Sequence, residues 1–223
     1  SVGTSVGDWH HMAVQRAGNV HTFYINGQLQ NSKTDSSNVH NFQGNKLRLG
    51  NYGGGNGGPY GQNVYFSDVR HVKGTAVYSG NFTPPSGPLT KTGGTYPSTT
   101  NVNTSIPSGH TKLLTAQNSS GSYVDNSDSN HTLTASGTVT PSAGIQGAPA
   151  DLSSSSYSAS YGGNTTHSYI SPFAQGAGGS VLFDGTGDYL STSTSSDLVI
   201  GTNNFTIEYW IYPTDLSSTK MLL

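Results

Sequence analysis

Short runs of β-forming residues separated by turn residues recur along the chain. Residues 9–15 (WHHMAVQ) and 20–25 (VHTFYI) are rich in aromatic and β-branched side chains, which favour strands. Residues 16–19 (RAGN) join these two runs and end in a Gly-Asn pair typical of a hairpin turn. Asn26-Gly27 follows directly, and both residue types accept the positive φ of a two-residue type I′ turn. The start of the chain therefore predicts two strands and, from Gln28 on, a third.

Runs of β-forming residues predict a further strand at residues 64–72 (VYFSDVRHV) and, within both 122–136 and 179–193, two strands joined by a turn. Alternation of apolar and polar side chains predicts strands at residues 46–49 (KLRL) and 203–213 (NNFTIEYWIYP), because successive residues of a strand lie on opposite faces of a sheet. In the last of these, one face carries Phe205, Ile207, Tyr209 and Ile211, and the other carries Thr206, Glu208, Trp210 and Tyr212. No segment has the 3.6-residue period of an amphipathic helix. The pattern therefore predicts an all-β fold.

Stretches rich in Gly, Ser, Thr and Pro interrupt the predicted strands. Residues 50–63 (GNYGGGNGGPYGQN) form a Gly-rich loop, and the prolines of residues 80–90 predict an extended exit from the preceding strand. Residues 91–110 consist mostly of Thr, Ser, Gly, Asn and Pro, a composition typical of a linker. The sequence therefore predicts two structured parts, residues 1–90 and 111–223, joined by a linker at 91–110.

Composition narrows the class of protein. Charged residues make up 9% of the chain and the formal net charge is −2. A nucleic-acid-binding face or a polybasic membrane patch requires clustered Lys and Arg, so both are excluded. The chain has no Cys, which excludes disulfides and zinc-thiolate chemistry, and no apolar run approaches the length of a membrane span. Aromatic residues at 10%, combined with Gly- and Asn-rich turns, are typical of a β-sandwich or barrel.

Longer motifs relate these segments to a known family. Its domains close with stretches matched here by Trp9–Asn19, Tyr24–Leu29, Leu47–Gly50 and Ser67–Thr90, and they open with stretches matched by Lys112–Gly137, Gly179–Leu190 and Phe205–Pro213. The longest and most specific match is SDVRHVKGTAVYSGNFTPPSGPLT at Ser67–Thr90. The chain thus resembles the laminin-G-like, concanavalin A-like jelly rolls of phage tail-fibre and virion structural proteins, those of cyanophages especially. This resemblance implies an antiparallel β-sandwich.

The two parts stand in the reverse of the family order, because the closing part comes first. Two arrangements account for this. The chain can be a window of a tandem array with half a domain at each end, or its ends can complete one jelly roll, within the chain or between neighbouring chains. In both cases we expect that a few strands of the family pattern are missing between Leu223 and Ser1. The start at Ser1 rather than Met also leads us to expect a processed or partial segment.

The related fold also carries glucanases, so catalysis must be considered. Retaining glycoside hydrolysis needs two carboxylates about 5 Å apart, and the family glucanases supply them as E-x-D-x-x-E on a strand. Glu208 is the one Glu of this chain, and Tyr-Trp-Ile-Tyr-Pro follows it without a second acid. We therefore expect no glycosidase activity. The resemblance gives Glu208 a structural role, accepting hydrogen bonds beside Trp210.

Carbohydrate binding is a second possibility, because a sugar site needs an aromatic platform and a few planar polar groups. Candidate residues in and beside the 50–63 loop are Asn51, Tyr52, Asn56, Tyr60 and Asn63, and Trp210 is a further candidate platform. The alternative is that the loop is a plain tip and that Trp210 is covered by its own domain. For Trp210 we favour this alternative.

Calcium is a weaker possibility. Asp184 and Asp188 flank a Gly-rich turn, and oxygen ligands at such turns suit Ca²⁺. Some laminin-G-like domains hold one calcium ion in this way. Asp residues in turns more often accept hydrogen bonds from their own backbone, and we favour that interpretation. Calcium is the one cofactor considered.

Taken with the resemblance, these features predict a non-enzymatic structural and adhesive segment of a phage fibre or virion appendage. We expect it at the virion surface or outside the cell, in contact with neighbouring copies of similar domains and with host surface carbohydrate. The alternative of the same physical class is a bacterial surface adhesin or an extracellular filament subunit. A glycan-cleaving enzyme is disfavoured by the number of acids.

Overall fold

The computed structural model describes residues 4–37, 45–50, 63–117, 123–137, 139–142, 171–173, 179–184 and 188–215. Its strands are β1 (His10–Ala17), β2 (Val20–Ile25), β3 (Gln28–Thr34), β4 (Arg48–Leu49), β5 (Asn63–Lys73), β6 (Thr111–Thr115), β7 (Leu133–Ser136), β8 (Thr140–Ser142), β9 (Ser180–Asp184), β10 (Tyr189–Thr192) and β11 (Phe205–Pro213). A 3₁₀ helix, η2 (Ser196–Leu198), precedes β11, and the described residues contain no α-helix. The predicted all-β fold is confirmed.

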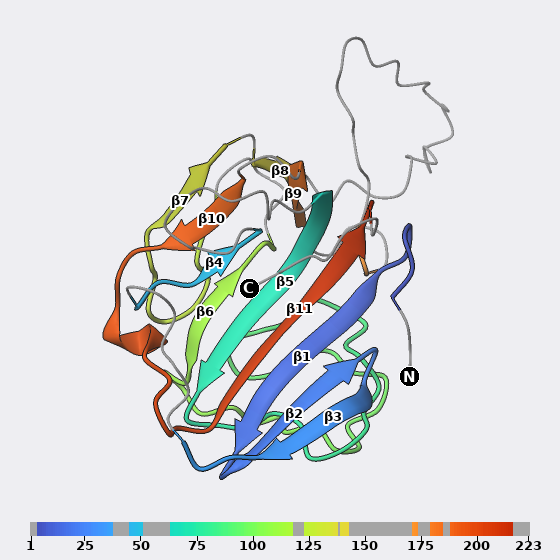
Figure 1. The fold of residues 1–223 in the computed structure, drawn as a ribbon, viewed down its shortest axis with the longest axis vertical. Coiled ribbons are helices and arrows are strands. Elements are labelled where there is room, and N and C mark those ends of the chain that lie inside the picture. Colours follow the sequence, from blue (N-terminus) through green and yellow to red (C-terminus); the bar gives the residue numbers. More distant parts are fainter. Residues whose placement is uncertain are drawn as a thin grey trace, which may run out of the picture.

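Strands from both ends of the chain form one large antiparallel sheet. Its order is β3-β2-β1-β11-β5-β9-β8, and β6 pairs with β5 beside β9. Figure 1 shows β11, close to the C-terminus, lying between β1 and β5. His10 pairs with Ile211 at one end of the β1–β11 ladder and Arg16 pairs with Phe205 at the other. In the structure, strands from the two ends of the chain therefore belong to one sandwich.

A second sheet, of order β4-β10-β7, packs on one face of the large sheet and gives the sandwich its main core. The predicted apolar face of β11 lies in this core, since Phe205, Ile207, Tyr209 and Ile211 belong to it. Leu49 of β4 and Leu190 of β10 face them from the small sheet. Burial of these side chains supplies the main hydrophobic stabilisation of the sandwich.

The opposite face of the large sheet is covered by residues 74–110, here called the covering segment. Val77, Phe82 and Ile106 of this segment form a second buried cluster with Ala13 and Tyr24 of the sheet. Because both faces of the large sheet are covered, β5 and β11 are buried on both sides. In β5 every residue except the first and the last is buried, and in β11 every residue except Tyr212 is buried.

The predicted linker, residues 91–110, is thus part of a packed layer. Tyr96 and Val102 pack against the second cluster, and Ile106 donates its backbone N–H to the carbonyl of Thr92. Its Ser, Thr and Pro content reflects irregular backbone on a protein surface, where side chains and turns replace a ladder. Strands from residues 1–90 and from residues 111–223 pair in one sheet, in which β11 lies between β1 and β5. Residues 91–110 belong to the segment that packs on the face of this sheet.

The Asn26-Gly27 turn is confirmed and also fixes the covering segment. Both residues have positive φ, 49° and 73°, as a type I′ turn requires. A side chain at Gly27 would meet the carbonyl oxygen of Phe82 at 1.9 Å, so the position accepts only Gly. The freed space lets Phe82 donate its N–H to the Gly27 carbonyl. Gly27 therefore serves two purposes, because it permits the type I′ turn and also the close approach of the covering segment.

The outer edge of the large sheet at β3 is partly closed by side chains. Leu29 donates its backbone N–H to Asn81 Oδ1 of the covering segment, at 2.9 Å, and Ser32 donates to Asn31 Oδ1, at 2.8 Å. Exposed Lys33 lies on the same strand. Occupied amides and a charged side chain on an edge strand oppose pairing with another chain.

Fragments of the chain should not fold alone, because β11 separates β1 from β5. We expect residues 1–110 and 111–223, expressed separately, to be insoluble or molten, with free strand edges. Mixed together, the two fragments should regain a cooperative unfolding transition, measured by circular dichroism. A cooperative transition of monomeric 1–110 by itself would contradict this arrangement.

Candidate functional site

The most strongly polar site of the described residues is a buried cluster on the covered face of the large sheet, here called the Glu208 cluster. It contains Glu208 of β11, Arg70 of β5, His11 of β1, and Tyr78 and Tyr96 of the covering segment. Arg70 donates to Glu208 Oε1 from Nε at 2.8 Å and from Nη2 at 2.5 Å. The Tyr78 hydroxyl donates to Oε2, and His11 Nε2 lies 3.4 Å from the same oxygen. Both carboxylate oxygens are thus held, and the Glu208 and Arg70 side chains are fully buried.

A β-bulge places Arg70 opposite Glu208. The pairing of β11 with β5 runs from Trp210 opposite Ser67 to Glu208 opposite Arg70, so β5 has one extra residue between them. Asp68 lies in this bulge with a φ of 50°, a left-handed value that Asp accepts more readily than most residues. The extra residue puts Ser67 and Arg70 on the same face of β5. Without it, Arg70 would point into the apolar core of the sandwich.

Arg70 also ties the covering segment to the sheet. Its Nη1 donates to the backbone carbonyls of Thr90, at 2.9 Å, and Gly93. Nη2 contacts the Tyr96 hydroxyl at 3.4 Å. One guanidinium group therefore joins β5, β11 and the covering segment, using the fixed geometry of its five donors.

The electrostatics of the cluster keep Glu208 ionised. Burial alone would raise the pKa of this carboxyl, but the Arg70 charge, the adjacent His11 ring and the Tyr78 hydrogen bond together outweigh it and hold the pKa at about 2. Burial and the adjacent Glu208 carboxylate raise the pKa of Tyr78 well above its ordinary value. Tyr78 therefore stays a hydrogen-bond donor, and Glu208 stays a carboxylate paired with Arg70 at neutral pH.

A second buried carboxyl, that of Asp68, has the opposite character. Its Oδ1 accepts from the backbone N–H of Leu89, at 2.7 Å, and from Gln117 Nε2, at 2.5 Å, while Oδ2 is buried without a hydrogen-bond partner. Burial raises the pKa of Asp68 to about 7 and outweighs these two hydrogen bonds. These hydrogen bonds connect the bulge to Leu89, at the end of the proline-rich stretch, and to Gln117, two residues after β6.

Of the predicted glycan-binding residues, the structure describes Asn63 and Trp210. Asn51, Tyr52, Asn56 and Tyr60 lie outside the described residues. Asn63 begins β5 with an exposed side chain and pairs with Asp184 of β9, so these two candidate residues are neighbours in the sheet.

Trp210 does not offer an exposed platform. The residue is 9% exposed, and its ring lies edge-on to His11 at 5.2 Å and to Phe173 at 6.0 Å between ring centroids. A sugar stacks on a free aromatic face. Trp210 is therefore placed as the favoured alternative predicts, covered by residues of its own domain.

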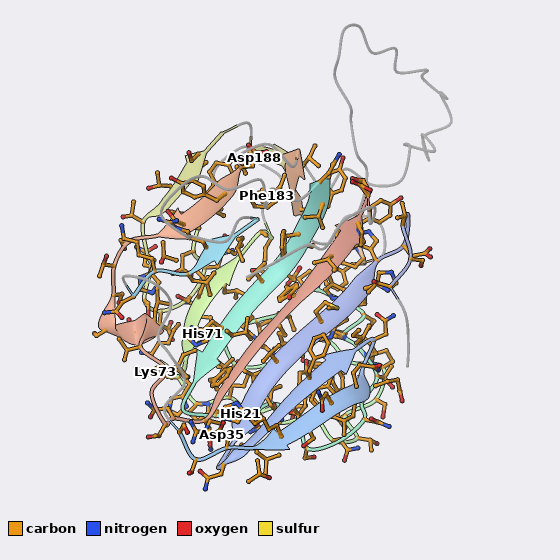
Figure 2. All side chains as sticks on the ribbon, in the orientation of Figure 1. His21, Asp35, His71, Lys73, Phe183 and Asp188 are labelled. Atoms are coloured by element: carbon orange, nitrogen blue, oxygen red, sulfur yellow. The ribbon has the colours of Figure 1, made fainter. Side chains whose placement is uncertain are left out.

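The candidate calcium pair is only partly described. The Asp184 side chain lies outside the described part of the chain. Asp188, labelled in Figure 2, is fully buried directly before β10. A Cβ atom at Gly137 would lie 2.1 Å from Asp188 Oδ1, so the carboxylate packs directly against this Gly backbone. The described residues contain no group of three or more His, Cys, Asp or Glu side chains that could hold a metal ion. Calcium binding at this pair stays a prediction.

Sequence reasoning identified Glu208 as structural but missed its partners. Arg70 lies within the predicted strand 64–72, and an Arg that is buried in a sheet requires an acid nearby. Glu208, at the centre of another predicted strand, was one candidate partner, but the sequence also offers Asp residues such as Asp68. Nothing comparable marks Tyr78 or Tyr96, since the chain has 13 Tyr and their positions depend on how the covering segment folds.

Comparison with known families supports the resemblance over part of the chain. Residues 2–75 match a laminin G-like family model described as the concanavalin A-like lectin/glucanases superfamily. The matched region spans β1 to β5 and includes the bulge and Arg70. Comparisons with curated proteins and with solved structures gave no match. Within the described residues, no helix is long and apolar enough to cross a membrane.

Removing the charge of Glu208 should strongly destabilise the fold. Glu208→Gln leaves the buried Arg70 charge without its partner, and breaking such a pair typically costs about 3–5 kcal/mol of unfolding free energy. Asp35→Asn, which breaks the exposed pair between Lys33 and Asp35, is the matched control and should leave stability close to that of the wild type. Urea denaturation measures both. Equal stability of the Glu208→Gln variant and the wild type would contradict the role given to this cluster.

The pH dependence of stability should report Asp68. The folded-state pKa of about 7 lies above the ordinary value of 3.8, so its stabilising contribution is complete below about pH 4 and is lost as the pH rises to about 7. Asp68→Asn keeps the acceptor oxygen and should remove this loss, making the variant more stable than the wild type at pH 8 relative to pH 4.

The comparison between wild type and Asp68→Asn isolates this effect from His71. Burial lowers the pKa of His71 from 6.5 to about 3, so its contribution falls as the pH drops through the same range and opposes that of Asp68. Glu208 loses its contribution only below about pH 4.5. Melting temperatures of the two proteins from pH 3 to 8 test the prediction, and parallel curves would refute it.

Proposed function

We propose that this chain is a non-enzymatic structural and adhesive module of an extracellular appendage, a phage fibre or comparable virion component, which contacts host surface glycans. The observation that carries the non-enzymatic part is the burial of Glu208. A hydrolase needs an acid that reaches its substrate, whereas here the one Glu anchors the covering segment.

The burial of the two carboxyl groups with shifted pKa values, Glu208 and Asp68, also favours a role without catalysis. Glu208 and Asp68 have pKa values of about 2 and 7, a separation that in an open site would suit a base and an acid. Both residues are fully buried. Arg70 and Tyr78 hold both oxygens of Glu208, and burial closes the Asp68 carboxyl, its unpartnered Oδ2 included, to a sugar ring. The separation follows from burial and from one adjacent Arg, which are structural features.

Adhesion to glycans is supported by the side-chain chemistry of the predicted 50–63 loop. Loops held by a rigid scaffold carry binding groups more often than the scaffold itself. The 50–63 loop combines Tyr52 and Tyr60 with Asn residues, which supply stacking area and adaptable hydrogen bonds. Charged residues make up 9% of the chain, which favours neutral ligands.

Contact with neighbouring copies of similar domains is the second part of the proposed role. The described edge at β3 opposes strand addition, so we expect copies to meet through side chains of their surfaces. A bacterial adhesin or filament subunit would use the same physical design. The phage assignment rests on the resemblance of the Ser67–Thr90 motif to virion proteins.

The loop assignment predicts a binding defect without a folding defect. Tyr52→Ala combined with Tyr60→Ala should weaken binding on a glycan array or to host cells and leave the melting temperature nearly unchanged. Binding of the wild type should depend little on salt, because few charges are involved. Wild-type binding that persists undiminished in the double variant would remove the loop from the proposal. Release of reducing ends from polysaccharide by the wild type would overturn the non-enzymatic assignment.

A further inference from the structure

A pocket of about 640 Å³ lies on the covered face of the large sheet, beside the covering segment. Its floor is formed by Gln15, Tyr24, Val77 and Tyr78, each buried. Exposed residues of β1, β2 and the covering segment form the rim. The volume falls within the range of small-molecule sites, about 300–1,000 Å³. The lining includes no residue of the predicted 50–63 loop, and it does not include Glu208.

The walls of this pocket are held rigidly. Gln15 Oε1 accepts the backbone N–H groups of Val77 and Tyr78, at 3.1 and 2.9 Å, and its Nε2 donates to the Tyr78 carbonyl. The backbone N–H of Asn103 donates to the Val77 carbonyl at 2.7 Å, and an isolated bridge joins Tyr78 to Val102. The same Tyr78 side chain donates to Glu208. A preformed site of this kind binds without the cost of ordering its loops.

Several polar groups in the pocket have unused hydrogen-bonding capacity. Neither the Tyr24 hydroxyl nor Asn103 Nδ2 makes a hydrogen bond to any residue that the structure describes. Thr22 Oγ1 also lacks a partner, but it is closed to solvent, so a ligand in the pocket does not reach it. The Tyr24 hydroxyl and the Asn103 amide therefore remain available among apolar neighbours such as Val20 and Ala76.

From this lining we propose that the pocket binds one or two units of an uncharged saccharide, as a second contact besides the 50–63 loop. The lining contains no Asp, Glu, Lys, Arg or His, so a charged ligand would lose its hydration without gaining a counter-charge. Hydroxyl and amide groups on an apolar wall match the alternating polar and apolar faces of a sugar ring. This inference deepens the proposed function and rests on it, since both concern contact with host glycans.

Amide chemical shifts of the ¹⁵N-labelled whole chain provide the test, during titration with maltose, lactose and cellobiose as neutral probes. Glucuronate and glucosamine serve as charged probes. We expect the neutral probes to shift amides of Thr22, Tyr24 and residues 101–103. Tyr24→Phe should weaken binding about two- to tenfold, the range of one hydrogen bond, whereas Thr22→Val, which removes a hydroxyl closed to solvent, should not. Thr104→Val, an exposed Thr outside the pocket, is the matched control and should bind as the wild type does.

Stability distinguishes this role from a purely structural one. Because the Tyr24 hydroxyl has no partner among the described residues, Tyr24→Phe should leave the melting temperature nearly unchanged while binding falls. Unchanged affinity in the Tyr24→Phe variant, shifts confined to residues outside the pocket, or tighter binding of the charged probes would each overturn the pocket assignment. If glycan-array binding is lost in the Tyr52→Ala, Tyr60→Ala variant but kept in the Tyr24→Phe variant, the pocket fails and the proposed function stands. A wild type that binds no glycan overturns both.

Discussion

A charged carboxylate at the centre of a sheet must be paired, and the Glu208 cluster is the pairing on which the rest of this structure depends. An ion in a protein interior costs several kcal/mol unless its partners are close and well oriented. Arg70 provides the charge from the neighbouring strand, and Tyr78 provides a hydroxyl from the covering segment. The covering segment must therefore lie on the sheet for the sheet itself to be stable. Three parts of the chain that are distant in sequence are in this way folded as one unit.

Coverage of both faces of the large sheet determines where the molecule can meet a partner. The small sheet covers one face, and the covering segment takes most of the other. What remains are the loops at the ends of the strands and the pocket beside Val77 and Tyr78. Function in such a module depends on rigid positioning of a few uncharged groups. The Glu208 cluster contributes by fixing Tyr78, which serves both as an acceptor for Gln15 and as the floor of the pocket.

The sequence predicted the strands well, because their signals are local. The alternation in residues 203–213 correctly separated the core side of β11 from the side of Glu208, and Asn26-Gly27 correctly predicted a two-residue turn. Residues 91–110 were harder, because a surface layer and a flexible linker share the same Ser, Thr, Gly and Pro content. The packing of Tyr96 and Ile106 depends on contacts with strands far away in sequence. The bulge at Asp68 and the pocket also escape a local pattern, since both arise where separate segments meet.

The central claim is that β11 completes the sandwich of its own chain between β1 and β5. Cross-strand nuclear Overhauser effects from Glu208 to Ala13 and to Arg70 test it most directly. They should be measured in a sample that mixes isotope-labelled and unlabelled copies, with filters that separate contacts within one chain from contacts between chains. We predict that both contacts occur within single chains. Their appearance only between labelled and unlabelled copies would show that neighbouring molecules exchange β11, and their absence would show that β11 does not belong to this sheet.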